Sequence, residues 1–250
     1  MLARLWTRPA RRQYAPSMSA HWDSLTVDGS EMRCHVSIPD SKRPFPGVLV
    51  CMHAPGVDGF IQGIGARLAE SGFAAVSPEL YHRQADGNAN PLEKMGRLRD
   101  DEIVRDLTAA AANLRELPGV DAARCAVVGF CMGGRLSYLF ASHDEALRAA
   151  VVFYGGNIML PWGDGPAPFD RSDRIACPVL GLFGDEDGNP SPEDVARIDA
   201  ELARLGKPHE FHGYAGAGHA FLNAQRPSYR EEAATDAWGR CIAWLHSHLA

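Results

Sequence analysis

A short glycine-rich turn constrains the fold of this chain more than any other stretch. The segment Gly129–Gly134 (GFCMGG) directly follows the apolar run 125–128 and directly precedes the helix-like segment 135–142. A strand that turns abruptly into a helix holds its corner residue in strained backbone geometry, and small neighbours let the backbone pass close by. The corner residue here is Cys131. The pattern therefore predicts an elbow that presents a cysteine at the N-terminus of a helix.

Cys131 at such a corner is a candidate nucleophile. Unpaired N–H groups and the helix dipole at a helix N-terminus favour the thiolate over the thiol. Two other interpretations fit the same letters, a tight turn with an ordinary buried cysteine and a phosphate-binding loop. A phosphate-binding loop is disfavoured because no Gly-Lys-Ser/Thr follows the glycines.

The apolar pattern on both sides of the elbow predicts a mainly parallel sheet with helices on both faces. Continuous apolar runs, typical of strands buried on both faces, occur at 48–52, 73–77, 149–154 and 178–183. Segments with helical spacing alternate with these runs and begin at 60, 103, 191 and 228. Active groups are then expected on loops at the carboxyl ends of the strands.

Local signals add detail to this outline. The strand-like pieces 24–28 and 32–38 predict an antiparallel hairpin at a sheet edge. Ser191 with Asp194, and Ser228 with Glu231, each have the spacing of a capping box that opens a helix. The stretch 155–174, rich in Gly, Pro and Trp, is predicted to be a lid or rim loop.

Length and composition favour one domain that binds a small molecule. A chain of 250 residues with 46% hydrophobic residues can bury a sizeable core, which we assign to residues 21–250. Residues 1–20 hold four arginines and no acidic residue, and we expect a disordered extension there rather than a transit peptide. The net charge of −6 argues against nucleic acid or an anionic membrane as the main partner. We expect a monomer or a homodimer.

The cysteine pattern indicates a reducing compartment. The six cysteines are scattered along the chain without CxxC spacing or a compact disulfide framework. We therefore expect a cytoplasmic protein that uses neither a metal nor another cofactor. No apolar run approaches the length that a bilayer span requires.

A cysteine nucleophile needs a base, and the base needs an orienting carboxylate. His219 lies in a glycine-rich loop after the strand-like segment that ends at Tyr214, and is the predicted general base. Asp187 follows the strand 179–183 and is the predicted acid, with Asp185 and Glu186 as nearby alternatives. The chain order of nucleophile, acid and histidine is the order that an α/β-hydrolase sheet imposes.

An oxyanion hole is predicted from two backbone N–H groups. One belongs to Met132, which directly follows the nucleophile, and the other lies at the end of the strand 48–52. Pro55 has no N–H group, so Ala54 is the second predicted donor.

Four motifs together resemble those of the dienelactone hydrolase (carboxymethylenebutenolidase) family. They are the elbow Gly129–Gly134, Glu79-Leu80-Tyr81-His82-Arg83, Gly184-Asp185-Glu186-Asp187 and His219-Ala220-Phe221. The resemblance extends from about residue 24 to the end of the chain. It implies an α/β-hydrolase domain with a Cys131–His219–Asp187 triad, which cleaves a lactone or carboxylic ester through an acyl-cysteine intermediate.

This chain departs from the family pattern at two positions. Family members carry a glutamate that contacts the resting thiol, and alignment on Gly56 puts His53 there. The family's lactone hydrolases hold the substrate carboxylate with two arginines. Arg83 matches the first of them, whereas Asn223 stands where the second would be. If His53 contacts Cys131, we expect His53→Glu to slow alkylation of the thiol, because a carboxylate opposes the thiolate.

The leading hypothesis is a carboxylesterase-like enzyme, a cysteine-dependent hydrolase of a small ester or lactone. Arg83, His53, Tyr81, Asn223 and Trp162 are its predicted substrate-binding residues. Two alternatives stay open. One is a thioesterase or other esterase on the same scaffold, and the other is a non-catalytic α/β-hydrolase-like protein that binds a small molecule. Alkylation of Cys131 would discriminate between a reactive and an inert site.

Overall fold

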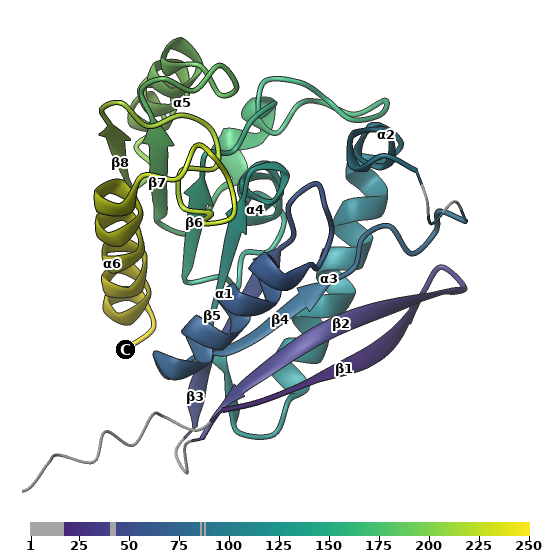
Figure 1. Cartoon of the computed structure of the whole chain (residues 1–250). Helices are drawn as coiled ribbons and strands as arrows, with labels where there is room; N and C mark the ends of the chain where they lie inside the picture. Colours follow the sequence, from purple (N-terminus) through teal and green to yellow (C-terminus); the bar gives the residue numbers. More distant parts are fainter. Residues whose placement is uncertain (1–17, 41–43, 86, 88) are drawn as a thin grey trace, which may run out of the picture.

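Eight strands form one sheet in the computed structural model, which describes residues 18–40, 44–85, 87 and 89–250. The strands are β1 (Met18–Val27), β2 (Ser30–Pro39), β3 (Phe45–Cys51), β4 (Ala74–Pro78), β5 (Val120–Phe130), β6 (Ala149–Phe153), β7 (Val179–Gly184) and β8 (His209–Tyr214). Their order across the sheet is β1-β2-β4-β3-β5-β6-β7-β8 (Figure 1). Strands β3 to β8 run parallel, while β1 and β2 are antiparallel to their neighbours. The prediction of a mainly parallel sheet is therefore confirmed.

Burial along the strands follows their place in the sheet. Every residue of β4, β6 and β7 is buried, as expected of central parallel strands covered on both faces. The edge strand β1 is mostly exposed. It forms the predicted hairpin with β2 through a turn at Asp28 and Gly29, both of which have positive φ. The hairpin is longer than predicted, since β1 begins at Met18.

Helices cover both faces of the sheet. They are α1 (Gly59–Glu70), α2 (Pro91–Gly96), α3 (Asp100–Glu116), α4 (Met132–Ala141), α5 (Pro192–Arg204), α6 (Glu231–His248) and the 3₁₀ helix η1 (Phe169–Arg174). On one face α1 and α6 lie together, and the Arg67 guanidinium stacks on the Trp238 ring at 3.9 Å (Figure 1). On the other face α3 and α4 are joined by an ion pair between Asp100 and Arg135.

Of the two predicted capping boxes, one is present and the other is not. The capping box at Ser191 and Asp194 is present and opens α5. The predicted box at Ser228 is wrong, because α6 begins at Glu231 and its N-cap residue Arg230 makes no side-chain cap bond. The preceding residues are folded back instead, since the Arg230 N–H donates to the carbonyl oxygen of Phe221.

Helix α2 lies between β4 and α3 and was not predicted from the sequence. Asn90 caps this helix by accepting a hydrogen bond from the Leu92 N–H at 2.9 Å, and Pro91 occupies its first turn. With six residues and no buried side chain, α2 is too short for an apolar periodicity to be visible.

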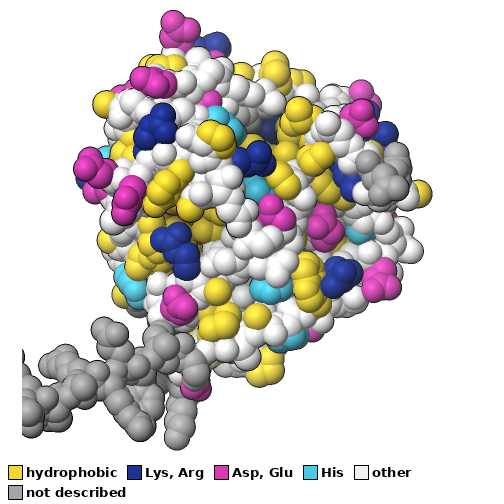
Figure 2. Space-filling view, viewed as in Figure 1, with side chains coloured by type: hydrophobic (Ala, Val, Ile, Leu, Met, Phe, Trp, Pro, Cys, Tyr) yellow, Lys and Arg dark blue, Asp and Glu magenta, His cyan; other side chains and the backbone are white. Residues whose placement is uncertain are grey.

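Residues 1–17 lie outside the described residues, and the predicted boundary at residue 20 falls inside β1. Among the described helices, none combines the length and the apolar character that crossing a bilayer requires. Figure 2 shows basic and acidic side chains interspersed on the face seen in Figure 1.

Candidate active site

Cys131 sits at a sharp corner between β5 and α4. Its backbone has φ 57° and ψ −120°, a conformation that costs energy for any residue with a Cβ. Two backbone hydrogen bonds hold the corner. The Cys131 N–H donates to the carbonyl oxygen of Phe153 on β6 at 3.1 Å, and the Cys131 carbonyl accepts from the Gly134 N–H at 2.9 Å. The predicted elbow is thus present, with its side chain partly exposed.

Close backbone contacts explain the glycines beside the cysteine. A Cβ atom added at Gly129 would overlap the carbonyl oxygen of Gly133. One added at Gly133 would overlap the carbonyl oxygen of Cys51 on β3. Helix α4 can therefore start this close to β3 and β5 only if both positions lack a side chain.

His219 and Asp187 face each other across the carboxyl ends of β7 and β8. The His219 Nδ1 and the Asp187 Oδ2 are 2.8 Å apart and hydrogen-bonded. Asp187 is 5% exposed, and its other oxygen accepts from the Asn189 N–H at 2.9 Å. Asp185 and Glu186, the two alternatives, are exposed. Geometry therefore selects Asp187 as the carboxylate that orients the imidazole.

The pKa values of the Cys131 thiol and the His219 imidazole shift in opposite directions. Burial by itself raises the Cys131 pKa, but the hydrogen bond and charge of His219, with the N–H groups of Met132 and Ala54, lower it below its ordinary value. Burial lowers the His219 pKa, while Asp187 and Cys131 raise it to about 10. Both directions favour a thiolate beside an imidazolium.

Met132 and Ala54 supply the two backbone N–H groups that contact the Cys131 sulfur. One lies at the start of α4 and the other in the loop after β3. Tyr81 holds that loop, because its hydroxyl donates to the Ala54 carbonyl at 2.7 Å. The Glu79 carboxylate holds it too, accepting from the Val57 N–H at 3.1 Å. These two side chains place the Ala54 N–H beside the thiol.

Two of the predicted substrate-binding residues, Tyr81 and Arg83, bind protein partners in the structure. Tyr81 is buried against Ala54 and the Met132 sulfur. Arg83 pairs with Asp106, at 2.6 Å from the nearer oxygen, and with Asp28 at 2.9 Å. Neither lines the two cavities beside Cys131. The Tyr81 hydroxyl and the Arg83 guanidinium are bound to protein partners. Substrate contact by Tyr81 and Arg83 stays a prediction, and their contacts in the structure are with protein partners.

His53 lies at the edge of the site but turns toward a different partner. Its Nε2 is 2.8 Å from the Asp58 Oδ1, without the alignment of a good hydrogen bond. Its ring also packs on the Phe60 ring, with centroids 5.2 Å apart. The groups that lower the Cys131 pKa are His219, Met132 and Ala54. The structure gives His53 a place in the cavity wall, where its ring contacts Asp58 and Phe60.

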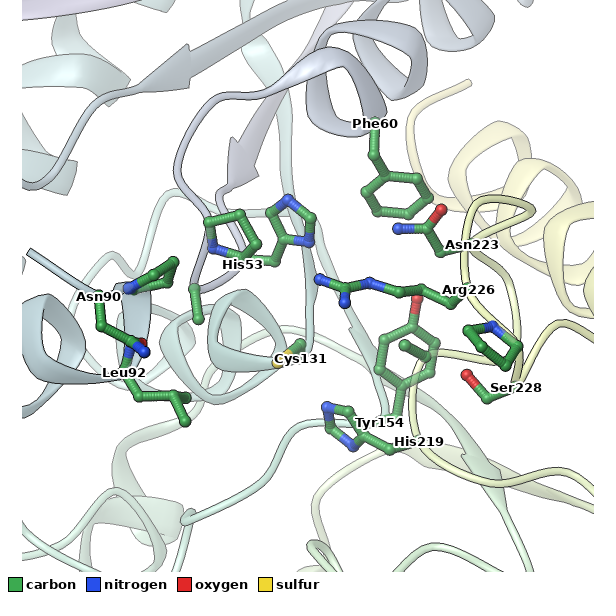
Figure 3. A pocket seen from close by; sticks show the side chains of 15 residues that line it. His53, Phe60, Asn90, Leu92, Cys131, Tyr154, His219, Asn223, Arg226 and Ser228 are labelled. Atoms are coloured by element: carbon green, nitrogen blue, oxygen red, sulfur yellow. The ribbon is translucent and has the colours of Figure 1, made fainter. Parts of the chain in front are cut away.

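Two cavities open beside Cys131, with volumes of about 590 and about 420 Å³. His53 and Asn223 line the larger one, and Trp162 lines the smaller one. Figure 3 shows the larger cavity, with Arg226 reaching across it above Tyr154. Substrate binding by His53, Asn223 and Trp162 stays a prediction, while their positions in the cavity walls are consistent with it.

A buried ion pair behind the smaller cavity was not predicted from the sequence. Arg135 on α4 is fully buried and binds both carboxylate oxygens of Asp100, at 2.6 and 2.9 Å. It also donates to the Asn157 and Leu160 carbonyls and stacks on the Trp162 ring at 3.9 Å. An arginine among the apolar residues of the elbow helix was the available signal, since a buried arginine needs partners.

Arg226 and Tyr154 were also missed. Arg226 was not predicted because no strand or helix pattern surrounds it. Tyr154 was not predicted because the sequence places it as the last residue of a buried strand. Tyr154 has φ 38° and a buried hydroxyl without a hydrogen-bond partner in the described part of the chain. Within the same residues, no three His, Cys, Asp or Glu side chains converge as a metal site would require.

The parallel sheet, the cysteine elbow and the His219 loop define an α/β-hydrolase fold. Comparison with known proteins agrees. The model of the Dienelactone hydrolase family matches residues 32–249, and the chain belongs to that family. It is therefore a hydrolase.

Individual relatives cover most of the chain. A protein of Methylorubrum extorquens with the name "Putative carboxymethylenebutenolidase" is 35% identical over 85% of this chain and 75% of its own length. A protein of Yersinia pestis with the same name is 35% identical over 90% and 87%. The crystal structure of a "Putative Dienelactone Hydrolase" from Klebsiella pneumoniae superposes with a TM-score of 0.86, at 32% identity over 92% of this chain and 99% of that one.

Proposed function

We propose that this protein hydrolyses a small lactone or carboxylic ester by covalent catalysis through Cys131. The observation that carries the proposal is one continuous chain of contacts. Asp187 holds His219, His219 holds the Cys131 thiol, and two backbone N–H groups point at the sulfur. This is the set of groups that acyl transfer to a cysteine requires.

In the first half of the reaction the Cys131 thiolate attacks the ester carbonyl carbon. The carbonyl oxygen becomes an oxyanion, which the N–H groups of Met132 and Ala54 stabilise. The tetrahedral intermediate collapses as the carbon–oxygen bond to the alcohol breaks. The His219 imidazolium gives its proton to the departing alkoxide, and an acyl-cysteine thioester is left.

In the second half a water molecule attacks the thioester. His219, now neutral, takes a proton from the water, and the same two N–H groups stabilise the second oxyanion. The carbon–sulfur bond then breaks, which releases the carboxylic acid and returns the thiolate beside the imidazolium. Asp187 stays ionised throughout and keeps the imidazole in one orientation.

The proposal includes a reducing, cytoplasmic location. All six cysteines are free thiols, and five of them are buried. A catalytic thiolate is readily oxidised, so a reducing compartment would protect it.

The direct test compares Cys131→Ala with Cys177→Ala, which removes a buried thiol distant from the elbow in sequence. With an aryl ester, we expect the first change to lower kcat by at least about a thousandfold and the second to have little effect. Mass spectrometry of the wild-type protein, quenched during turnover, should show the acyl group on the peptide that contains Cys131. Unchanged turnover in Cys131→Ala would refute the proposal.

A further inference from the structure

The two cavities beside Cys131 share one wall and differ in their chemistry. Four residues border both of them: Ala54, Leu92, Cys131 and His219. The reactive sulfur and its base therefore stand at the junction of two separate spaces. Each space, at about 590 and about 420 Å³, is by itself in the size range of small-molecule sites.

The larger cavity offers free polar groups. The Arg226 side chain is exposed and has no ion pair or hydrogen bond within the described residues, so its charge is available to a ligand. Below it lies Tyr154, 1% exposed, with an unpartnered hydroxyl (Figure 3). A buried hydroxyl without a partner is costly unless a ligand or water satisfies it. A guanidinium and a phenol together recognise an anionic group.

The smaller cavity offers an apolar surface. Trp162, Met95, Met132 and Leu92 line it. Its polar residues are occupied by one another, because the Asn189 side chain donates to the Asn157 side chain at 3.1 Å and Asp187 binds His219. The Trp162 ring stacks on Arg135, and the backbone N–H of Trp162 donates to the Asp100 carboxylate at 2.9 Å. A fixed aromatic wall suits an apolar group of the substrate.

On the basis of the proposed function, we infer that the preferred substrate is an acyclic ester with an anionic group on one side of the scissile bond and an apolar group on the other. The scissile carbonyl must lie at Cys131, at the junction, so each side of the ester enters a different cavity. A compact lactone joins both sides in one ring and cannot extend into the two cavities at once.

The test uses five substrates assayed by kcat/KM. Benzyl hydrogen succinate and (phenylacetoxy)acetate carry both groups, in the two possible orientations. Methyl hydrogen succinate carries only the anion, and benzyl acetate only the apolar group. A carboxylated γ-butyrolactone serves as the compact comparator. We expect one of the two-group esters to exceed each of the other three by at least about tenfold.

Variants then assign each group to its cavity. Arg226→Gln should lower kcat/KM for the better two-group ester about tenfold more than for benzyl acetate, and Arg240→Gln, an exposed arginine on α6, is its control. Trp162→Ala should lower the value for the two-group ester about tenfold more than for methyl hydrogen succinate, with Trp22→Ala on β1 as control. Met95→Ala tests the same apolar wall of the smaller cavity without changing a residue of the loop 155–174.

The outcomes separate this inference from the proposed function. If the lactone is the best substrate, or if each variant lowers all five values equally, the two-cavity inference is overturned while the esterase proposal stands. If the folded protein hydrolyses none of the five substrates, both proposals fail.

Discussion

Two histidines border the same cavity, each 2.8 Å from an aspartate, yet only one of them also hydrogen-bonds the Cys131 thiol. His219 contacts Asp187 through Nδ1, which leaves Nε2 for the Cys131 thiol. His53 contacts Asp58 through Nε2, its outer nitrogen. The comparison shows that a histidine–aspartate pair can act as a base only when the second ring nitrogen faces the nucleophile.

The two aspartates differ as much as the histidines. Asp187 is buried, and its contacts are His219 and one backbone N–H group. The side chain of Asp58 is 37% exposed and is the N-cap of α1, where it accepts from the N–H groups of Phe60 and Ile61. Asp58 therefore has a structural duty that does not depend on His53.

The largest contrast is expected from replacing each histidine by asparagine. His219→Asn removes the proton donor and acceptor of the proposed reaction, so kcat/KM should fall by about 10⁴-fold. His53→Asn should change it by less than about tenfold, because the ring only lines the cavity. Steady-state kinetics on one aryl ester measure both values. Equal losses would mean that the two pairs are not functionally distinct.

Replacing the aspartates should separate catalysis from stability. Asp187→Asn is expected to lower kcat by about 10³ to 10⁴-fold, because the imidazole loses the group that fixes its tautomer. Asp58→Asn should leave kcat nearly unchanged, and its free energy of unfolding as well, because asparagine caps a helix about as well as aspartate. Asp58→Ala should cost about 1 kcal/mol in urea unfolding. A large loss of kcat in Asp58→Asn would contradict the structural role.

Alkylation with iodoacetamide should depend on pH in a way that reports the Cys131–His219 pair. Because the Cys131 pKa lies below its ordinary value, its thiolate persists to lower pH than the thiolate of an ordinary cysteine, and it is lost as the pH falls through that lowered pKa. Burial raises the pKa of Cys51 to about 12. Labelling of Cys51 at neutral pH should therefore be at least about a thousandfold slower than labelling of Cys131.

Hydrolysis should decline at the other end of the pH scale. The His219 pKa is raised to about 10, so the imidazolium that protonates the leaving group is lost as the pH rises through that value. Peptide mapping of the alkylated protein and a kcat profile from pH 5 to 11 check the two limbs. Equal labelling of Cys131 and Cys51 would argue against a stabilised thiolate.

The smallest effect is expected from His53→Glu. The sequence alone suggested that this change would slow alkylation of Cys131 by placing a carboxylate beside the thiol. With the side chain turned toward Asp58, we expect a slowing of less than about threefold at neutral pH. Stopped-time alkylation assays measure the rate. A slowing of more than about tenfold would show that position 53 reaches the thiol.

Local sequence signals determined the parts of this protein that depend on neighbouring residues. The elbow, the buried parallel strands and the cap at Ser191 could be predicted because glycine content, apolar runs and capping spacing act over a few residues. Chain order also led to Cys131, Asp187 and His219, since parallel strands bring their carboxyl ends to one edge.

Only the tertiary structure decided which side chains share a partner. No local pattern distinguishes Asp187 from Asp185, or reveals that Arg83 is held by Asp28 and Asp106. The free Arg226 and the turned ring of His53 depend likewise on elements far apart in the chain. The physical reason is that ion pairs and cavity walls are set by distances of a few ångströms between distant segments, whereas sequence patterns report the conformation of one segment at a time.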